Sequence, residues 1–189
     1  MNENILLMRK AKYQLKNNWL NAAIGTLIYA VILGVAGSTG LLELIIIGPI
    51  SFGLILFLSC IADTNNADFN LLFKGFYRFV ETLIAGLIVS LIIGCGFILL
   101  IVPGIIAMTG LSLTFYIMID DPNISGLDAI KMSWNMMNGH KAELFCLWLR
   151  FFGWFLLALL TLGIGFLWLR PYMILTTLNY YRKLRYGTF

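Results

Sequence analysis

The stretch TLIAGLIVSLIIGCGFILLIVPGIIAMTGLSLTFYIMI runs from Thr82 to Ile119 without a single charged residue. A helix needs only about 20 apolar residues to cross the hydrocarbon core of a bilayer, so these 38 residues are too many for one crossing. The chain must turn back within them, and Gly94, Gly96 and Pro103 mark the region where a helix is most easily broken. The stretch therefore predicts a hairpin of two membrane-spanning helices.

Three further apolar stretches extend this pattern to the rest of the chain. Residues 19–37 are uncharged, and residues 41–62 contain a single acid. Residues 144–181 form another stretch of 38 residues, interrupted at Gly163 and Gly165, which is long enough for two crossings. The sequence thus predicts six transmembrane helices arranged as three hairpins with short outer turns.

The composition leads to the same conclusion. Apolar residues make up 60% of the 189 residues and charged residues 12%, whereas soluble domains are roughly half apolar and about a quarter charged. A globule of this size cannot bury so much apolar surface, which excludes an ordinary soluble protein, and the hydropathy excludes a disordered one. We expect an all-α polytopic membrane protein whose single membrane domain covers residues 1–189.

Basic residues indicate which side of the membrane each loop faces. In the six-helix arrangement, both termini and the loops 63–81 and 120–141 share one side, which holds 11 of the 13 basic residues. The opposite turns hold none, and an excess of lysine and arginine is typical of cytoplasmic loops. Both termini are therefore predicted to be cytoplasmic. The basic residues form no long face with interleaved polar residues, so no nucleic-acid partner is expected.

Three segments on the cytoplasmic side are predicted to form short amphipathic helices in the membrane interface. Asp68 is placed to cap the second of them, and Ser125 with Asp128 forms a capping-box pattern at the start of the third. Basic edges on these helices suit anionic lipid heads, and the alternative is that the helices close the cytoplasmic face of the bundle. Both interpretations stay open. The apolar positions are Leu7, Met8, Ala11, Leu15 and Trp19 in the first helix, Phe69, Leu72, Phe73 and Phe76 in the second, and Leu127, Ile130, Trp134 and Met137 in the third.

An internal repeat is predicted from the order of these elements. Each hairpin follows one amphipathic helix, and the second helix of each hairpin contains a proline, at Pro49, Pro103 and Pro171. Such a period indicates three copies of one unit, in pseudo-threefold order. The units span about residues 4–63, 68–121 and 125–185.

Small residues recur at every fourth position in the first helices of the first two hairpins. This spacing lets helix backbones approach closely, so tight packing within the chain is expected there. The residues are Ala22, Thr26, Ala30, Gly34 and Ser38 in one helix and Thr82, Gly86, Ser90 and Gly94 in the other.

Four ionisable residues in or beside the apolar stretches are the candidate ligand-binding residues, because charges inside a membrane usually face the bundle interior. Glu43 and Arg170 both lie near outer turns, where they would form an ion pair between the second and sixth helices or contribute to an outer gate. Arg150 lies roughly 14 Å along its helix from Lys141, and the nearest candidate partner is Glu81. We expect Arg150 to pair with Glu81, and the alternative partner is an anionic ligand or lipid head.

The sequence has few signatures of an enzyme. It contains no P-loop, GxSxG or HExxH motif, and its short loops leave no room for a soluble catalytic domain. The single histidine, His140, is expected to cap the C-terminal end of a helix, and the three widely spaced cysteines are expected to be buried small hydrophobes. Asp120 and Asp121 are interpreted as the end of a helix before Pro122. No catalytic residue, metal site or cofactor is predicted.

The sequence carries motifs that resemble a known family. They are an FxGW motif ending at Trp154, LTxGIGxLWxxPY from Leu160 to Tyr172, YRKL from Tyr181 and VPGII from Val102. With them, nearly the whole chain resembles the bacterial integral membrane proteins catalogued as domain of unknown function 975. It is distantly similar to the membrane domain attached to some glycerophosphodiester phosphodiesterases, whose catalytic domain is absent from this sequence. The resemblance implies the bacterial cytoplasmic membrane as the location and leaves the activity open.

The sequence favours a non-enzymatic integral membrane protein that binds or organises lipid, chiefly anionic lipid, or a membrane protein partner. The wide amphipathic layer on the cytoplasmic side motivates this hypothesis. The alternative is a small transporter or channel for an anionic or amphipathic solute, with Arg150 and the polar face of the sixth helix in its path. A membrane enzyme that acts on a lipid phosphate is a third hypothesis, and it would need Asp120 or Asp121.

Overall fold

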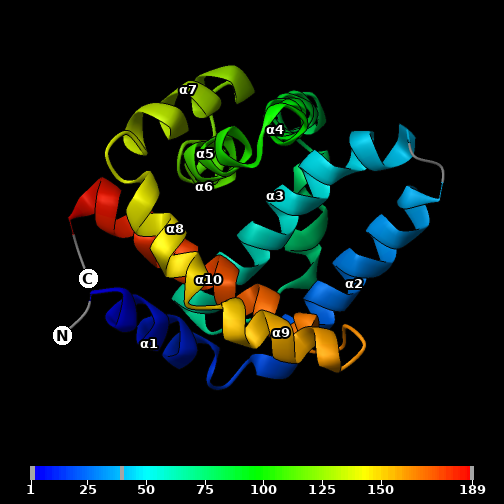
Figure 1. Cartoon of the computed structure of the whole chain (residues 1–189). Coiled ribbons are helices and arrows are strands. Elements are labelled where there is room, and N and C mark those ends of the chain that lie inside the picture. Colours follow the sequence, from blue (N-terminus) through cyan, green and yellow to red (C-terminus); the bar gives the residue numbers. More distant parts are fainter. Residues whose placement is uncertain (1–2, 39–40, 188–189) are drawn as a thin grey trace.

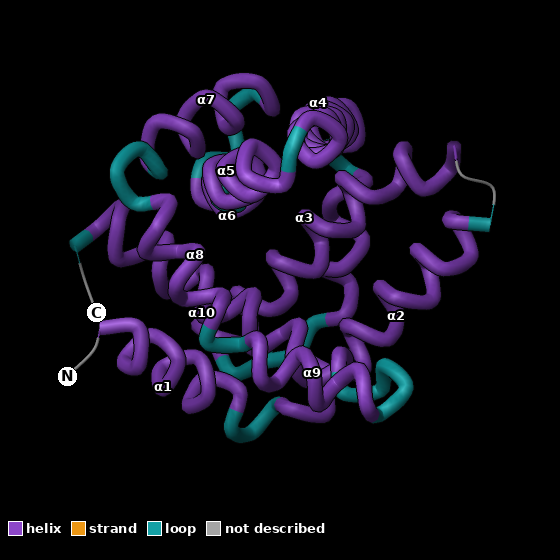
Figure 2. The backbone as a smooth tube through the Cα atoms, in the orientation of Figure 1, coloured by secondary structure: helices purple, strands orange, loops and turns teal. Residues whose placement is uncertain are grey.

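The computed structural model describes residues 3–38 and 41–187. Throughout these two ranges the chain forms helices joined by short turns, and no strand occurs in them (Figure 2). The prediction of an all-α protein is confirmed. The first outer turn, predicted near Gly40, lies outside the described residues.

The helices follow one another as labelled in Figure 1. Only two residues separate α5 from α6 and α8 from α9, so each of these pairs forms one broken helix. The elements are α1 (Glu3–Leu15), α2 (Trp19–Gly37), α3 (Leu41–Thr64), the 3-10 helix η1 (Phe69–Phe76), α4 (Phe79–Leu99), α5 (Ile101–Leu111), α6 (Thr114–Asp120), α7 (Gly126–Met136), α8 (Lys141–Leu149), α9 (Phe152–Leu160) and α10 (Phe166–Tyr186).

Five helical stretches in the described part of the chain are long and apolar enough to cross a membrane, as expected of a membrane protein. The helix α10, which corresponds to the predicted sixth crossing, is not among them. Its hydropathy is lowered by Arg170, by Asn179 and by the basic residues near its C-terminal end. The five stretches are Trp19–Gly37, Leu42–Thr64, Phe79–Leu99, Ile101–Asp120 and Lys141–Leu160.

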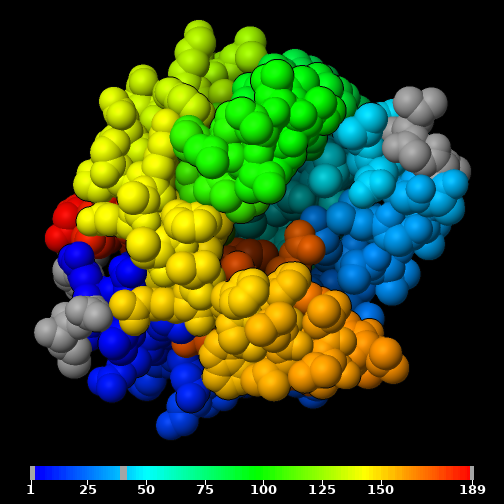
Figure 3. Space-filling model, viewed as in Figure 1, coloured from blue at the N-terminus to red at the C-terminus, as the bar shows by residue number. Residues whose placement is uncertain are grey.

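The helix α10 lies in the middle of the molecule, where it packs against α1, α2, α3, α8 and α9 (Figure 1). Every residue from 175 to 181 is buried, including Thr176, Thr177 and Asn179. Figure 3 shows the surface hollowed between α4–α5 and α9, with α10 visible at the bottom of the hollow. Because other helices shield α10 from its surroundings, it can keep polar side chains that a lipid-facing helix would avoid.

The helices α3 and α4 cross in direct backbone contact. A Cβ atom added to Gly86 would lie 2.5 Å from the Cα of Gly48, so the two backbones touch. The expected close packing of small residues therefore occurs at Gly86. It does not extend to Gly34 or Gly94, since an added Cβ at either position would meet nothing within 4 Å.

The predicted amphipathic helix at the N-terminus is present as α1, and its apolar arc faces the protein. Leu7, Ala11 and Leu15 are buried, and α1 packs against α10 and α3. This arc therefore closes one end of the bundle, which is one of the two roles expected of these helices.

The second amphipathic segment folds as the 3-10 helix η1. Asp68 caps it as predicted, because its carboxylate accepts a hydrogen bond from the backbone N–H of Asn70 at 3.0 Å. A 3-10 helix has about three residues per turn, which directs Leu72 and Gly75 inward. Phe73 and Phe76, the other part of the predicted stripe, are 47% and 38% exposed and do not pack fully into the bundle.

The third amphipathic helix is α7, and its capping box is present. The hydroxyl of Ser125 accepts a hydrogen bond from the backbone N–H of Asp128 at 3.2 Å. The predicted apolar stripe is shifted around the helix. Small and polar residues face inward, because Gly126 lies against the backbone of α4 and the hydroxyl of Ser133 donates to the carbonyl of Gly110 at 2.8 Å. Ile130 and Met137 are buried as predicted, whereas Leu127 and Trp134 are 49% and 40% exposed.

Candidate functional site

The four residues predicted to bind a ligand lie in separate surroundings. Arg170 donates a hydrogen bond to the hydroxyl of Tyr29 at 2.7 Å, and its guanidinium lies 4.1 Å from the centre of the Tyr29 ring. The Tyr29 hydroxyl also lies 3.3 Å from the hydroxyl of Ser51. Both Arg170 and Glu43 are described, and no ion pair joins them. The expected Glu43–Arg170 pair is therefore replaced by a contact between α10 and α2.

The predicted pair between Arg150 and Glu81 is also wrong. The carboxylate of Glu81 accepts a hydrogen bond from the backbone N–H of Gly126 at 2.6 Å. An acidic group at the first turn of a helix is favourable, because unpaired N–H groups and the helix dipole meet it there. Glu81 thus holds the start of α7 against α4 and is not directed toward Arg150.

Arg150 lies at the break between α8 and α9, on the side of α8 that faces α1. It is exposed on an open groove of about 450 Å³, which Glu3, Glu143 and Cys146 also line. Its guanidinium forms no hydrogen bond or ion pair with a described residue. The break in the helix contributes to this difference, because α8 ends at Leu149 and Arg150 lies in the turn that leads into α9.

The C-terminal end of α10 joins several helices through ionic and phenolic contacts. The carboxylate of Asp120 accepts hydrogen bonds from Tyr181, at 2.8 Å, and from Tyr186, and it pairs with Arg185 at 3.2 Å. The bond to Asp120 raises the pKa of the Tyr186 phenol, which keeps the phenol protonated as a donor. Arg182 forms a double hydrogen bond with Asp63, with both distances 2.6 Å.

Three smaller predictions meet different outcomes. The chain leaves the helix at Asp121, before Pro122, as expected. His140 does not cap the C-terminal end of a helix; it precedes α8, and its ring lies 3.3 Å from Glu143. Cys95 and Cys146 are exposed rather than buried, and Cys60 is half-buried. Within residues 3–38 and 41–187, no group of three or more His, Cys, Asp or Glu side chains is arranged to share a metal ion.

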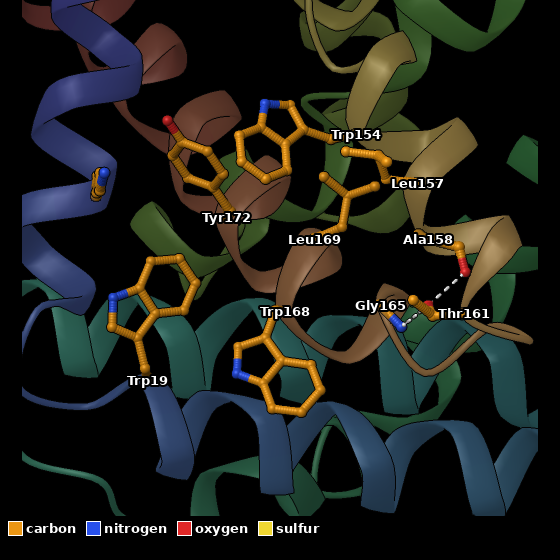
Figure 4. A pocket seen from close by; sticks show the side chains of 10 residues that line it. Trp19, Trp154, Leu157, Ala158, Thr161, Gly165, Trp168, Leu169 and Tyr172 are labelled. Carbon is orange, nitrogen blue, oxygen red and sulfur yellow. Dashed lines mark hydrogen bonds between the residues drawn. The ribbon is translucent and has the colours of Figure 1, made fainter.

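A groove of about 380 Å³ between α1, α9 and α10 was not anticipated (Figure 4). The indole rings of Trp19, Trp154 and Trp168 face one space. Lys12 also lines the groove and is the one charged residue among the described residues that line it. The other lining residues are Leu157, Ala158, Thr161, Gly165, Leu169 and Tyr172.

The turn between α9 and α10 brings the two walls of this groove together. The hydroxyl of Thr161 donates to the carbonyl of Ala158 at 2.8 Å and accepts from the backbone N–H of Gly165 at 3.0 Å. These two bonds tie the end of α9 to the start of α10. On the far side, the Trp19 ring meets Tyr172 edge-on at 6.1 Å. The groove is thus held between elements far apart in the sequence.

The chemistry of the groove suits an amphipathic anion. Its walls are almost entirely apolar, and aromatic rings pack well against hydrocarbon chains. The ammonium group of Lys12 forms no ion pair with any residue that the structure describes, so it is available to an anionic group. The arrangement therefore offers an apolar channel with the cation of Lys12 in its lining.

The motifs that carry the family resemblance meet in this groove. The FxGW motif supplies Trp154, and the LTxGIGxLWxxPY motif supplies Thr161, Gly165, Trp168 and Tyr172. Trp168 and Tyr172 are four residues apart, which places them on one face of α10 and was a signal present in the sequence. Thr161 and Gly165 lie in the turn that joins α9 to α10. The contribution of α1 and of the start of α2 could not be predicted this way, because it depends on long-range packing.

Comparison with known proteins agrees with the resemblance of these motifs. The model of the family described as "Protein of unknown function (DUF975)" matches residues 93–187, the C-terminal half of the chain. The match is shorter than the expected resemblance over nearly the whole chain. No curated protein and no solved structure matches. The expected likeness to the membrane domain of glycerophosphodiester phosphodiesterases stays a prediction.

Proposed function

The chain belongs to this family of proteins of unknown function, and we propose that it is a non-enzymatic integral membrane protein that binds and organises anionic lipid. The observation that carries the proposal is the aromatic groove with the unpaired Lys12 in its lining.

The proposed membrane arrangement has six crossings in three hairpins, in pseudo-threefold order, with α10 as the sixth. It is supported by the pairing of α2 with α3, of α4 with α5 and of α9 with α10. Both termini face the cytoplasm of a bacterial cell in this arrangement. An ion pair of 2.8 Å between Lys183 and Glu3 supports a common side, since it joins the end of α10 to the start of α1.

The lipid-facing surface in this proposal is formed by large exposed apolar side chains. Leu157 and Leu160 on α9 are 55% and 79% exposed, and Ile98 on α4 is 86% exposed. Soluble proteins seldom expose so many such residues in continuous patches, whereas a bilayer accepts them. Leu157 also lines the groove beside Lys12, so a lipid from the surrounding bilayer can enter the groove sideways.

In this proposal, the positive charge of Lys12 favours a lipid with an anionic headgroup over the neutral lipids around it. A hydrocarbon chain gains little by leaving the bilayer for an apolar groove, because lipid tails are as apolar as leucine. A lysine near the surface contributes about 1 kcal/mol toward an anionic lipid. The proposal therefore predicts selection by headgroup charge, with the aromatic walls holding the chain in place.

Tryptophan fluorescence tests the proposal, because the groove contains Trp19, Trp154 and Trp168. In vesicles, a brominated phosphatidylglycerol is expected to quench the emission more than an equal amount of brominated phosphatidylcholine. Lys12→Gln is expected to reduce this preference. Lys16→Gln serves as the control, since Lys16 is exposed nearby and does not line the groove. Equal quenching of the wild type by the two lipids would contradict the proposal.

The transport hypothesis receives less support from the residues first expected in its path. Thr176 and Thr177 donate to carbonyls of their own helix at 2.8 and 2.9 Å, and Asn179 donates to Gln14 at 2.9 Å. The hypothesis remains testable, since anion flux in liposomes that Arg150→Leu abolishes would favour it. A membrane protein partner would instead be retained through purification and identified in the complex.

A further inference from the structure

Two more grooves share the composition of the Lys12 groove, at other places on the surface. The first lies between α7 and the pair α4–α5, has a volume of about 430 Å³, and contains Lys131 and Trp134. The second lies between η1, α3 and α6, has a volume of about 430 Å³, and contains Lys74 and Tyr77. We refer to them as the Lys131 groove and the Lys74 groove.

The three grooves are built in the same way. Each takes its lysine from one amphipathic helix, which is α1, η1 or α7. Apolar wall residues come from spanning helices that precede η1 and α7 in the chain, such as Leu56 on α3 for the Lys74 groove and Ile92 on α4 for the Lys131 groove. In the Lys12 groove, whose lysine lies on α1, most of the apolar wall comes from α9 and α10. The grooves therefore follow one another around the bundle.

An aromatic side chain accompanies each lysine. Trp19 follows Lys12, Tyr77 follows Lys74, and Trp134 follows Lys131 along the chain. Tyr and Trp favour the boundary between hydrocarbon and headgroups, which is also where a lysine can reach a lipid phosphate. Each groove thus presents an apolar wall, an interfacial ring and a cation.

The lysines are electrostatically available. Lys12 and Lys74 form no ion pair with any residue in the described part of the chain. Lys131 lies 3.6 Å from Asp128, but both side chains are mostly exposed, so this pair contributes little. In the Lys74 groove, Arg78 is already engaged by the carbonyls of Met118 and Ile124, at 3.3 and 2.9 Å.

The size of the grooves favours a lipid chain over a protein helix. A helix about 10 Å wide occupies roughly 420 Å³ for each turn of 5.4 Å, so each groove could hold only about one turn. A hydrocarbon chain is much thinner and follows such a channel lengthwise. The cations complete the match, because an anionic phospholipid places its phosphate at the depth of the amphipathic helices.

We propose that each of the three grooves binds one anionic phospholipid, so that the protein carries a ring of three such lipids. This inference rests on the proposed function and adds the number and positions of the lipids. It predicts three similar sites, each dependent on one lysine: Lys12, Lys74 or Lys131.

Native mass spectrometry with added phosphatidylglycerol tests the inference. The wild type is expected to bind up to three lipids. Lys12→Gln, Lys74→Gln and Lys131→Gln are each expected to weaken one site about fivefold, the equivalent of roughly 1 kcal/mol. The triple substitution is expected to weaken all three sites, and Lys16→Gln none. Phosphatidylcholine is the neutral control lipid and is expected to bind the three grooves about fivefold more weakly than phosphatidylglycerol.

The outcomes separate this inference from the function it rests on. If only Lys12→Gln weakens binding, the protein has one lipid site; the proposed function then holds and the ring of three is wrong. If the wild type retains no phosphatidylglycerol, both proposals fail. The lysines are on the surface, so folding of each variant can be verified by its melting temperature before lipid is added.

Discussion

Arg170 on α10 and Tyr29 on α2 are joined twice, by a hydrogen bond of 2.7 Å and by the guanidinium lying 4.1 Å from the ring centre. The two interactions have different origins, because the hydroxyl oxygen accepts a hydrogen bond from the guanidinium and the ring attracts its positive charge. Together they fix the start of the central helix to the first hairpin. Arg170 was expected to pair with Glu43, and its positive charge is engaged by Tyr29 instead.

Tyr29→Phe separates these two contributions. The substitution keeps the ring and removes the acceptor, so a decrease of about 1–2 kcal/mol in the free energy of unfolding is expected. Thermal or denaturant unfolding in detergent measures it. Tyr13→Phe is the matched control, because Tyr13 is 76% exposed. Equal stability of the two variants would mean that the hydrogen bond contributes nothing.

Gly86→Ala is expected to disrupt the crossing of α3 and α4. The new Cβ would lie 2.5 Å from the Cα of Gly48, and backbone cannot yield as a side chain would. Such overpacking is expected to lower the free energy of unfolding by about 1–3 kcal/mol. Gly94→Ala on the same helix is the control, since its Cβ meets nothing within 4 Å and alanine favours a helix by about 0.5–1 kcal/mol. The melting temperature should be highest for Gly94→Ala, intermediate for the wild type and lowest for Gly86→Ala.

Glu81 and Arg150 are expected to behave independently. Glu81→Gln weakens the contact with the first turn of α7 and should lower stability by about 0.3–1 kcal/mol. Arg150→Leu should leave that contact unchanged. The double variant is therefore expected to be additive within about 0.5 kcal/mol, as for residues that do not interact. A coupling energy above about 0.5 kcal/mol would mean that the two side chains interact, as the sequence predicts.

Cysteine labelling tests the proposed orientation. In a chain whose three cysteines are replaced by serine, Leu162→Cys lies in the turn between α9 and α10, which the proposal places outside the cell and where Leu162 is 95% exposed. Asn123→Cys lies in an exposed position between α6 and α7. A membrane-impermeant maleimide added to intact cells should label position 162, and position 123 only after permeabilisation. The reverse pattern would invert the topology.

Local features of this fold could be predicted from the sequence. The caps at Asp68 and Ser125 depend on residues two or three positions away, and both are present. Apolar length likewise located the five stretches that are long enough to cross a membrane, whereas the predicted sixth crossing, α10, is not among them. The rotation of each helix about its axis was less predictable, because it depends on long-range contacts. For α7, the contact of Gly126 with α4 and the bond from Ser133 to Gly110 turn Leu127 and Trp134 outward.

The candidate site likewise combines local features that the sequence indicates with long-range contacts that it does not. The four-residue spacing that places Trp168 and Tyr172 on one helix face was visible in the sequence. Lys12 was visible only as part of a basic edge, since nothing local indicates that α1 packs beside α9 and α10. The ion pairs expected for Arg150 and Arg170 failed for a related reason. Opposite charges at similar depth are common, whereas the helix break at Arg150 and the nearness of Tyr29 to Arg170 depend on how the bundle closes.

The central position of α10 has a consequence for biogenesis. Its neighbours α1, α2, α3, α8 and α9 are all synthesised before it, so they reach the membrane while the space they surround is still empty. Since α10 is too polar to leave the translocon readily on its own, we expect its insertion to depend on those waiting helices. Chains truncated before residue 166 should then be open assemblies that cellular proteases remove quickly, which pulse-chase labelling can measure. Normal lifetimes for such chains would indicate that the bundle closes without its central helix.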